Sequence, residues 1–322
     1  MMNPHEDEVS LAYPKTTSLR KSTHEPWPLG IATAGEHAVQ ELVRDAGCTP
    51  AACRAIRHLV YRFDRSQRRS LPWRGAAVSP YQVLVSEIML QQTQVDRVIP
   101  KYLAFIERFP TVAVLAQATL PEVLAHWQGL GYNRRGRYLR DAAVVVMERF
   151  QGELPSEVAL LTTLPGVGEY TAAAVRAFAF NRPSIVIETN IRAVLLYLLH
   201  PGEQGVTDTV LRQELALLQP TRDFRRWYAA LMDYGSDLKR RFANPSRASA
   251  HHVSQGRFEG SDRQIRGELV RQLLAGGPEG VRAEQLVSLA GGEEPRVQRM
   301  LDRLVGEGLA VRVNERYLIP KA

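Results

Sequence analysis

The stretch that decides the fold is LPGVGEYTAAAVRAFAFNRPSIVIETN, which runs from Leu164 to Asn190. It opens with a Leu-Pro-Gly-Val-Gly turn, and the residues after Gly168 are typical of a helix. Gly166 and Gly168 can adopt backbone angles that are closed to other residues and can let another chain approach closely. The N–H groups at the start of the helix would then face outward and bind an anion such as a DNA phosphate. The turn therefore predicts a phosphate site at Leu164, Gly166 and Gly168.

An acid follows the turn. The apolar run SIVI is followed by Glu188, which lies twenty residues beyond Gly168, and then by Thr189 and Asn190. A phosphate grip followed at this distance by a buried carboxylate suits an enzyme that holds a DNA backbone and acts on one sugar. Glu188 and Asn190 are therefore candidate catalytic residues. An ordinary helix-loop-helix with a solvated glutamate is the alternative.

The composition indicates an ordinary globular protein and favours a polyanionic partner. The 322 residues can form two or three domains, and 45% of them are apolar. Lys and Arg number 41 against 34 acids, which gives a net charge of +7. The surplus gathers in residues 221–266, with ten basic and five acidic side chains. We expect DNA contact in this segment, and a solvated basic face is the alternative.

Cysteine usage and the absence of targeting signals predict a cytoplasmic protein, nucleoid-associated if the source is prokaryotic. Cys48 and Cys53 are the two cysteines, and two thiols cannot build a disulfide framework or a four-cysteine metal site. No apolar stretch is long enough to span a membrane, and the first thirty residues lack the apolar block of a signal peptide. Residues 1–33 show no periodicity and predict a flexible tail.

A second informative stretch is YQVLVSEIMLQQTQV, residues 81–95, which predicts a buried helix because most of its residues are apolar. Glu87 stands in its middle. A carboxylate at such a position is unfavourable unless it is paired, protonated or functional. A structural salt bridge is the alternative to a catalytic role.

Five motifs occur in one order along residues 50–235. They are LPWR from Leu71, SEIMLQQTQV from Ser86, WQGLGY from Trp127, the LPGVG hairpin, and ALMDYG from Ala230. Together they resemble the helix-hairpin-helix DNA glycosylases, and most closely the adenine glycosylases of the A/G-mismatch type. The resemblance implies an all-α fold with a glycosylase core of two helical subdomains and double-stranded DNA as the partner.

The resemblance also implies roles for single residues. The glutamate that matches Glu87 protonates the purine in that family and makes it a leaving group. The side chains that match Gln91 and Gln92 lie against the DNA where the base was extruded. Tyr132 matches a side chain that wedges into the base stack, and a core or rim tyrosine is the alternative. Arg134 belongs to a basic run that matches the family as well. This run lies within residues 95–150, for which the sequence predicts three helices.

The chemistry of base removal gives these residues complementary tasks. Flipping a nucleotide out of a duplex costs a few kcal/mol, which the wedge residues and the phosphate grip would offset. The sugar then passes through a cation-like state, so one acid and one carboxylate are needed. Glu87 suits the acid because an apolar site raises the pKa of a carboxyl group. Glu188 would stay ionised, stabilise the sugar cation and help to position water.

Tyr170 indicates that base removal is not followed by strand cleavage. Relatives that also nick the backbone have a lysine at this position, and its amine forms a Schiff base with the opened sugar. A phenol cannot do so, and no lysine lies between Lys101 and Lys239. The sequence therefore predicts a monofunctional enzyme.

The chain departs from the family in its acid and in its cysteines. The family has Asp where this chain has Glu188, and an error of about 1 Å in placement can cost about a hundredfold in rate. Most relatives hold an iron–sulfur cluster with four cysteines, but residues 236–255 contain no thiol. We expect no metal and no cofactor, since the adjacent His251 and His252 are poorly placed to share a site. Arg240, Arg241 and Arg247 are expected to face phosphate instead.

Residues 261–322 differ from the family's usual carboxy-terminal domain, which recognises oxidised guanine. Three helical segments precede two alternating strands around Asn314 and Glu315, an order that resembles a winged helix. Such a domain can bind a DNA groove or dock a protein, and both uses stay open.

The whole reading is a flexible tail at 1–33, a glycosylase core at 34–260 with a six-helix barrel at about 76–181, and a winged-helix-like domain at 261–322. We expect a monomeric, monofunctional DNA glycosylase of base excision repair, with mismatched adenine as the leading substrate. The alternatives are a thymine or uracil mispair glycosylase, a catalytically weak binder of DNA damage, and a transcription regulator.

Overall fold

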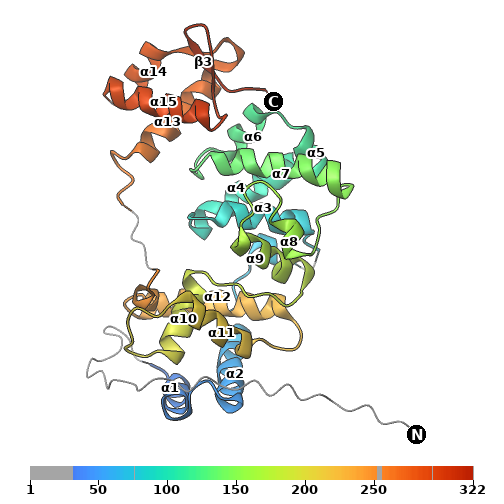
Figure 1. Cartoon of the computed structure of the whole chain (residues 1–322), viewed down its shortest axis with the longest axis vertical. Helices are drawn as coiled ribbons and strands as arrows, with labels where there is room; N and C mark the ends of the chain where they lie inside the picture. Colours follow the sequence, from blue (N-terminus) through green and yellow to red (C-terminus); the bar gives the residue numbers. More distant parts are fainter. Residues whose placement is uncertain (1–31, 76, 252–255, 292, 322) are drawn as a thin grey trace.

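The computed structural model describes residues 32–75, 77–251, 256–291 and 293–321, and most of them are helical (Figure 1). Within this part, no helix is long and apolar enough to cross a membrane. The predicted tail lies outside the described residues except at its end, where Thr33 caps the first helix through a capping box with Glu36. The hydrophobic side chains gather in three cores, one for each of three units.

The flanking unit, at the lower end of Figure 1, combines helices from both sides of the chain's middle. Its helices are α1 (Ala34–Ala46), α2 (Pro50–Gln67), α10 (Thr189–Leu199), α11 (Asp208–Leu218) and α12 (Phe224–Arg241). Buried Glu36 of α1 ties the two segments together, because it accepts hydrogen bonds from Tyr234 at 2.6 Å and from Arg241 at 2.5 Å on α12. The guanidinium and the phenol hold the pKa of Glu36 below its ordinary value, although burial opposes this.

The central unit contains the helices between these segments. They are η1 (Pro72–Arg74), α3 (Pro80–Leu90), α4 (Val95–Arg108), α5 (Val112–Gln117), α6 (Leu120–Trp127), α7 (Arg134–Phe150), α8 (Val158–Leu161) and α9 (Glu169–Phe180). The sequence predicts three helices in residues 95–150, and this is wrong, since α4 to α7 are four. The extra helix α5 has six residues, which is too short for a helical repeat to show.

Helix α9 joins the two units because its alanines allow close packing on both sides. Ala172 and Val175 belong to the central core, whereas Ala173, Ala174 and Ala177 belong to the flanking core. The hairpin stretch that opens with Leu164 therefore lies at the junction between the two units. This junction contains the pocket described below.

The C-terminal unit, at the top of Figure 1, has three helices and a small sheet. Its elements are α13 (Asp262–Gly276), η3 (Gly277–Glu279), β1 (Val281–Arg282), α14 (Ala283–Ala290), α15 (Glu294–Gly306), β2 (Val311–Val313) and β3 (Arg316–Leu318). The sheet is antiparallel in the order β1-β3-β2, with Val313 opposite Arg316. The structure confirms the predicted hairpin and adds β1, which two residues cannot signal in a sequence. Its classification as a winged helix stays a prediction.

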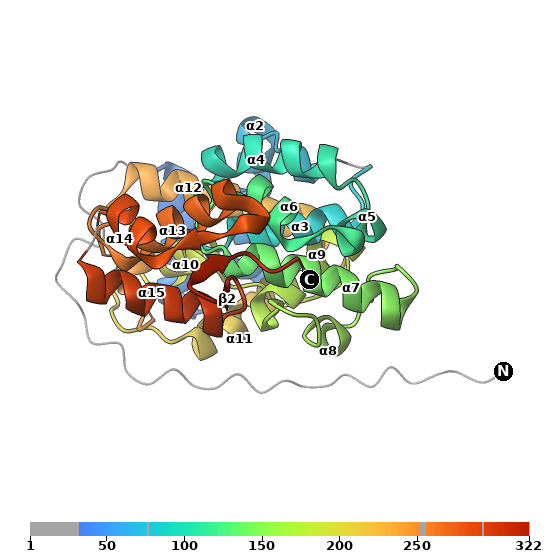
Figure 2. The same cartoon turned by 90° about the horizontal axis from the view of Figure 1, so that it is seen from above.

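The C-terminal unit packs on the central unit through α6 and α7. Leu120 and Leu124 of α6 belong to the same core as Leu269 of α13. Arg137 of α7 donates to the backbone oxygen of Glu307, whose carboxylate pairs with Arg266 at 2.5 Å. Seen from above, α14 and α15 lie to one side of the molecule and α5 and α8 to the other (Figure 2).

Candidate active site

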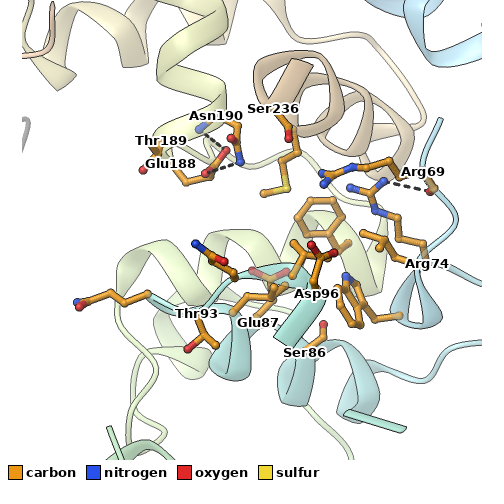
Figure 3. Close-up of a pocket in the computed structure, with 18 of the residues that line it drawn as sticks. Arg69, Arg74, Ser86, Glu87, Thr93, Asp96, Glu188, Thr189, Asn190 and Ser236 are labelled. Carbon is orange, nitrogen blue, oxygen red and sulfur yellow. Dashed lines mark hydrogen bonds between the residues drawn. The ribbon is translucent and has the colours of Figure 1, made fainter. Parts of the chain in front are cut away.

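A pocket of about 560 Å³ lies between the central and the flanking units. Its lower wall in Figure 3 carries Glu87 of α3, and its upper wall carries Glu188 and Asn190 at the start of α10. Tyr170 of α9 also lines it. Pockets of roughly 300–1,000 Å³ accept small ligands, so a single extruded nucleotide can be held there. The structure thus brings all four predicted catalytic residues together.

Glu87 is buried in the middle of α3, with 6% of its surface exposed. Burial raises its pKa to about 7, and the negative charge of Glu188 adds to this effect. The hydroxyl of Tyr170 donates to Oε2 at 3.5 Å. No ion pair to Glu87 occurs within the described residues, so the structural salt bridge does not explain it. A carboxyl group with a pKa of about 7 can hold a proton near neutral pH, as a general acid requires.

Glu188 is the N-cap of α10, and its carboxylate folds back onto the start of the helix. Oε1 accepts the backbone N–H groups of Asn190 at 2.8 Å and Ile191 at 2.9 Å, while Oε2 accepts the Asn190 amide at 3.1 Å. Burial raises the pKa of Glu188. The two backbone donors and the charges of Lys239 and Arg192 oppose this rise and favour the ionised form.

The hairpin is built as the sequence predicts at Gly166 but not at Gly168. Gly166 has φ +75°, and a Cβ there would lie 2.8 Å from the Cβ of Tyr138, so only glycine fits. Gly168 has φ −85° and open space around it, and it acts as the N-cap of α9. Leu164 is buried, so its side chain anchors the turn in the core and does not reach the surface. Gly168 and Glu169 are exposed at the start of α9, and a phosphate site there stays a prediction.

The predicted wedge residues lie on two loops with unusual backbone angles. Gln92 has φ 54° and Tyr132 has φ 48°, values that non-glycine residues seldom adopt. Gln92 lines the pocket, whereas the Gln91 amide donates to the Thr171 hydroxyl at 3.1 Å. Tyr132 is 39% exposed. Strained residues of this kind are typical of functional loops.

Arg135 holds both loops in place, a role that the sequence does not reveal. Its guanidinium is buried and donates to the backbone oxygen of Gln91 at 2.6 Å, and to those of Leu130 and Gly131 at 3.2 Å. The loop of Gln92 and the loop of Tyr132 are thereby fixed to one side chain. In the basic run, Arg135 is therefore internal, while Arg134 is exposed beside the ring of Tyr138.

The arginines after Gly235 also include both exposed side chains and one that is paired inside the protein. Arg240 and Arg247 are exposed, and Arg240 pairs with Asp237 at 3.2 Å. The expectation that Arg241 faces phosphate is wrong, because Arg241 is bound to Glu36 and Asp237 inside the flanking unit.

The segment that replaces the cysteine region is tied to its neighbours by backbone hydrogen bonds. Gly205 donates to the oxygen of Ala248 at 2.8 Å, and Ala250 donates to that of Val206 at 3.0 Å. His252 lies outside the described residues. In the described part of the chain, no group of three or more His, Cys, Asp or Glu is arranged to hold a metal ion.

The residues present do not fit a four-cysteine cluster. Cys48 and Cys53 lie together beside the start of α2, with their sulfurs 3.4 Å apart. Residues 236–255 supply no thiol. The absence of an iron–sulfur cluster stays a prediction, tested below.

Several residues of the pocket were not predicted. Arg69, Arg74 and Lys239 line it. Figure 3 shows the two arginines, and Asp233 is bound to both of them, at 2.6 and 2.7 Å. Asp233 is buried, and the arginines hold its pKa below the ordinary value against the effect of burial. A carboxylate engaged in this way is not available to replace Glu188 in catalysis. These residues come from segments more than 150 positions apart, so no local pattern signals them.

A buried acid faces a capped carboxylate across this pocket, beside a helix-hairpin-helix, and these features together define a base-excision glycosylase fold and site. The family model described as HhH-GPD superfamily base excision DNA repair protein matches residues 85–220. The chain belongs to this family, and DNA is its partner.

Curated relatives agree with this assignment. The chain is 38% identical over 260 residues to the adenine DNA glycosylase of Mycolicibacterium smegmatis, across 75% of this chain and 88% of that protein. It is 34% identical over 279 residues to that of Mycobacterium tuberculosis, across 80% of this chain and 91% of the relative. These relatives confirm the resemblance to adenine DNA glycosylases and make the chain a DNA N-glycosylase.

Among solved structures, the chain resembles a thermostable thymine-DNA glycosylase with a TM-score of 0.51 and 22% identity, over 61% of this chain and 97% of that one. At this identity the likeness concerns the fold alone. It agrees with the predicted helical fold.

Proposed function

We propose that the protein is a monofunctional adenine DNA glycosylase, which removes mismatched adenine and leaves the strand intact. The observation that carries the proposal is the pair of carboxyl groups in one pocket, Glu87 with a pKa of about 7 and Glu188 with donors that favour its ionised form. The adenine substrate rests on the names of the relatives from Mycolicibacterium smegmatis and Mycobacterium tuberculosis.

In the proposed reaction, Glu87 donates its proton to a ring nitrogen of the extruded adenine. The N-glycosidic bond then breaks, its electron pair leaves with the base, and positive charge develops on the sugar. Glu188 stabilises that charge, and a water molecule adds to the anomeric carbon and passes its proton to the Glu87 carboxylate, which restores the acid. Tyr170 lacks an amine, so it cannot form a Schiff base with the product.

The DNA grip is proposed to consist of three surfaces around the pocket. The N–H groups at Gly168 would bind a phosphate, and Gln92 and Tyr132 would fill the gap left by the extruded base. Exposed Arg134, Arg240 and Arg247 would contact the backbone. A monomer binding one lesion needs no second copy for this arrangement.

One screen tests the proposal and separates its alternatives. Duplexes with adenine opposite guanine or oxidised guanine, and with thymine or uracil mispairs, are incubated with the protein and treated with alkali to reveal abasic sites. We expect cleavage after alkali with the adenine mispairs. Cleavage with thymine or uracil alone would assign the second substrate class, and tight binding without any cleavage would indicate a binder of DNA damage.

A further inference from the structure

Lys239 brings a positive charge into the pocket from a helix outside the central unit. It lies in the last turn of α12, and its Nζ donates to Oδ1 of Asn190 at 3.0 Å. The same Asn190 donates its Nδ2 to Oε2 of Glu188 at 3.1 Å. Lysine, amide and carboxylate therefore form a continuous chain of hydrogen bonds that ends at a candidate catalytic group.

The approach of α12 to the start of α10 is built into the fold. Gly235 precedes Lys239 by four residues, so the two lie on the same face of α12. A Cβ at position 235 would collide with the backbone oxygen of Asn190. Only glycine lets the helices come this close, and the contact brings the Lys239 side chain to Asn190.

The lysine determines which way the Asn190 amide faces. An ammonium group has three donors and no acceptor, so it must contact the amide oxygen. The amide nitrogen is then turned to Glu188 and supplies a donor to its carboxylate. Without the ammonium group, the amide can rotate and place its oxygen against the carboxylate, which would lose a hydrogen bond and gain a repulsion.

We propose that Lys239 is a positioning residue of the active site, which orients the Asn190 amide toward Glu188 and whose charge favours the carboxylate form of Glu188. The inference rests on the proposed function for its catalytic meaning. The hydrogen-bond chain from Lys239 to Glu188 can be tested whether or not the protein releases adenine.

The charges around Glu188 are consistent with this role. The negative charge of Glu188 raises the pKa of Glu87 on α3 and of Tyr170 on α9, so it favours their neutral forms, although burial is the larger cause for both. Arg192 on α10 favours the carboxylate but is bound to Asp208 of α11, at 2.6 Å. The amine of Lys239 contacts a neutral amide instead, so an acid does not neutralise it in this contact.

The arginine on the opposite wall acts on the other carboxyl group. Arg74 of η1 lowers the pKa of Glu87 and is itself bound to Asp233 at 2.7 Å. Its charge is therefore shared with a buried acid. Lys239 is the cation on α12 that acts on Glu188.

The experiment compares full-length wild type with Lys239→Met and Lys239→Arg, and uses Lys321→Met as the matched control. Lys321 is exposed at the far end of the chain, so its variant removes the same charge without touching the pocket. Glutamate labelled with ¹³C at the carboxyl carbon reports the titration of Glu188, and Glu188→Gln identifies its signal. Single-turnover base release is measured across the same pH range.

We expect Lys239→Met to raise the titration midpoint of Glu188 by about one pH unit, a tenfold change in proton affinity. Lys239→Arg and Lys321→Met should stay near the wild-type value. In Lys239→Met, the pH below which the rate of base release falls should rise together with the Glu188 midpoint. A merely structural role would lower the rate at every pH and leave that pH unchanged.

Two results would overturn the inference. One is an unchanged Glu188 midpoint in folded Lys239→Met, verified by its melting curve. The other is a borohydride-trapped adduct of the wild type that Lys239→Met abolishes, because Lys239 would then be a nucleophile. If no duplex loses a base but the midpoint still moves, the proposed function fails while the positioning role stands.

Discussion

The two walls of the pocket favour different protonation states of a glutamate carboxyl group. On α3, Glu87 is buried among apolar side chains, and its carboxyl group accepts a long hydrogen bond from the Tyr170 hydroxyl at 3.5 Å. At the start of α10, Glu188 receives two backbone N–H groups and an amide within 3.1 Å. Both carboxyls are raised in pKa by burial, but only the second has close donors that stabilise its anion. The difference shows how one residue type can serve as acid on one wall and as anion on the other.

The largest expected effect comes from removing either carboxyl group. Glu87→Gln and Glu188→Gln should each reduce single-turnover base release by about a thousandfold or more, because each deletes a separate part of the reaction. Duplex affinity should change by a few-fold only. Exposed Glu148 on α7 provides the control, since Glu148→Gln removes a carboxylate far from the pocket. Near wild-type turnover by Glu188→Gln would refute the assigned pair.

The pH dependence of the protein's stability should also distinguish Glu87 from Glu188. The folded pKa of Glu87 is raised from 4.5 to about 7, so the protonated form is favoured and stability falls as pH rises through this window. At pH 8 this amounts to about 3 kcal/mol. Glu87→Gln should therefore melt at a higher temperature than wild type at pH 8 and at a similar one near pH 4.

The same melting curves test Glu188. Its close donors favour the anion, so Glu188→Gln should gain less stability at pH 8 than Glu87→Gln does. Equal gains in the two variants would mean that the walls do not differ, contrary to the contacts described above.

A smaller effect is expected from placing an amine beside Glu87. Tyr170→Lys should allow partial trapping of a covalent adduct with abasic DNA by borohydride, whereas wild type should form none. Lys239→Met in the Tyr170→Lys background is the control, and it should leave the trapping intact. Efficient trapping by wild type would contradict the monofunctional assignment.

No effect at all is expected from chelation. The purified protein should lack the visible absorbance of an iron–sulfur cluster, and a chelator should leave its melting temperature unchanged. Stoichiometric iron or zinc in elemental analysis would show that this reading of residues 236–255 is mistaken.

The sequence predicts those parts of the site whose signal is local. Glu87 in an apolar helix, Gly166 in a turn and Glu188 after an apolar run each stand out against their neighbours, and the structure brings the two acids to one pocket. Arg135 and Lys239 gave no such signal. An arginine in a basic run looks solvated, and its burial becomes visible only when the loops that it binds are folded around it.

The same reasoning explains the incorrect expectations. Leu164 and Arg241 were assigned to the DNA surface because they stand in a DNA-binding motif and a basic run. Tertiary packing buries the first and pairs the second with Glu36. Short elements such as α5 and β1 were missed because six or two residues contain too little periodicity to be recognised.

The composition of the flanking unit affects the order in which the units can fold during synthesis. Glu36 is buried against Tyr234 and Arg241, so α1 leaves the ribosome about 200 residues before its partners exist. Until α10, α11 and α12 emerge, α1 and α2 lack most of the core that they pack against. The central unit, continuous from η1 to α9, can fold first and offer α9 as a surface. The pocket would then form after the central unit, when α10 and α12 pack against α1 and α2 and complete its upper wall.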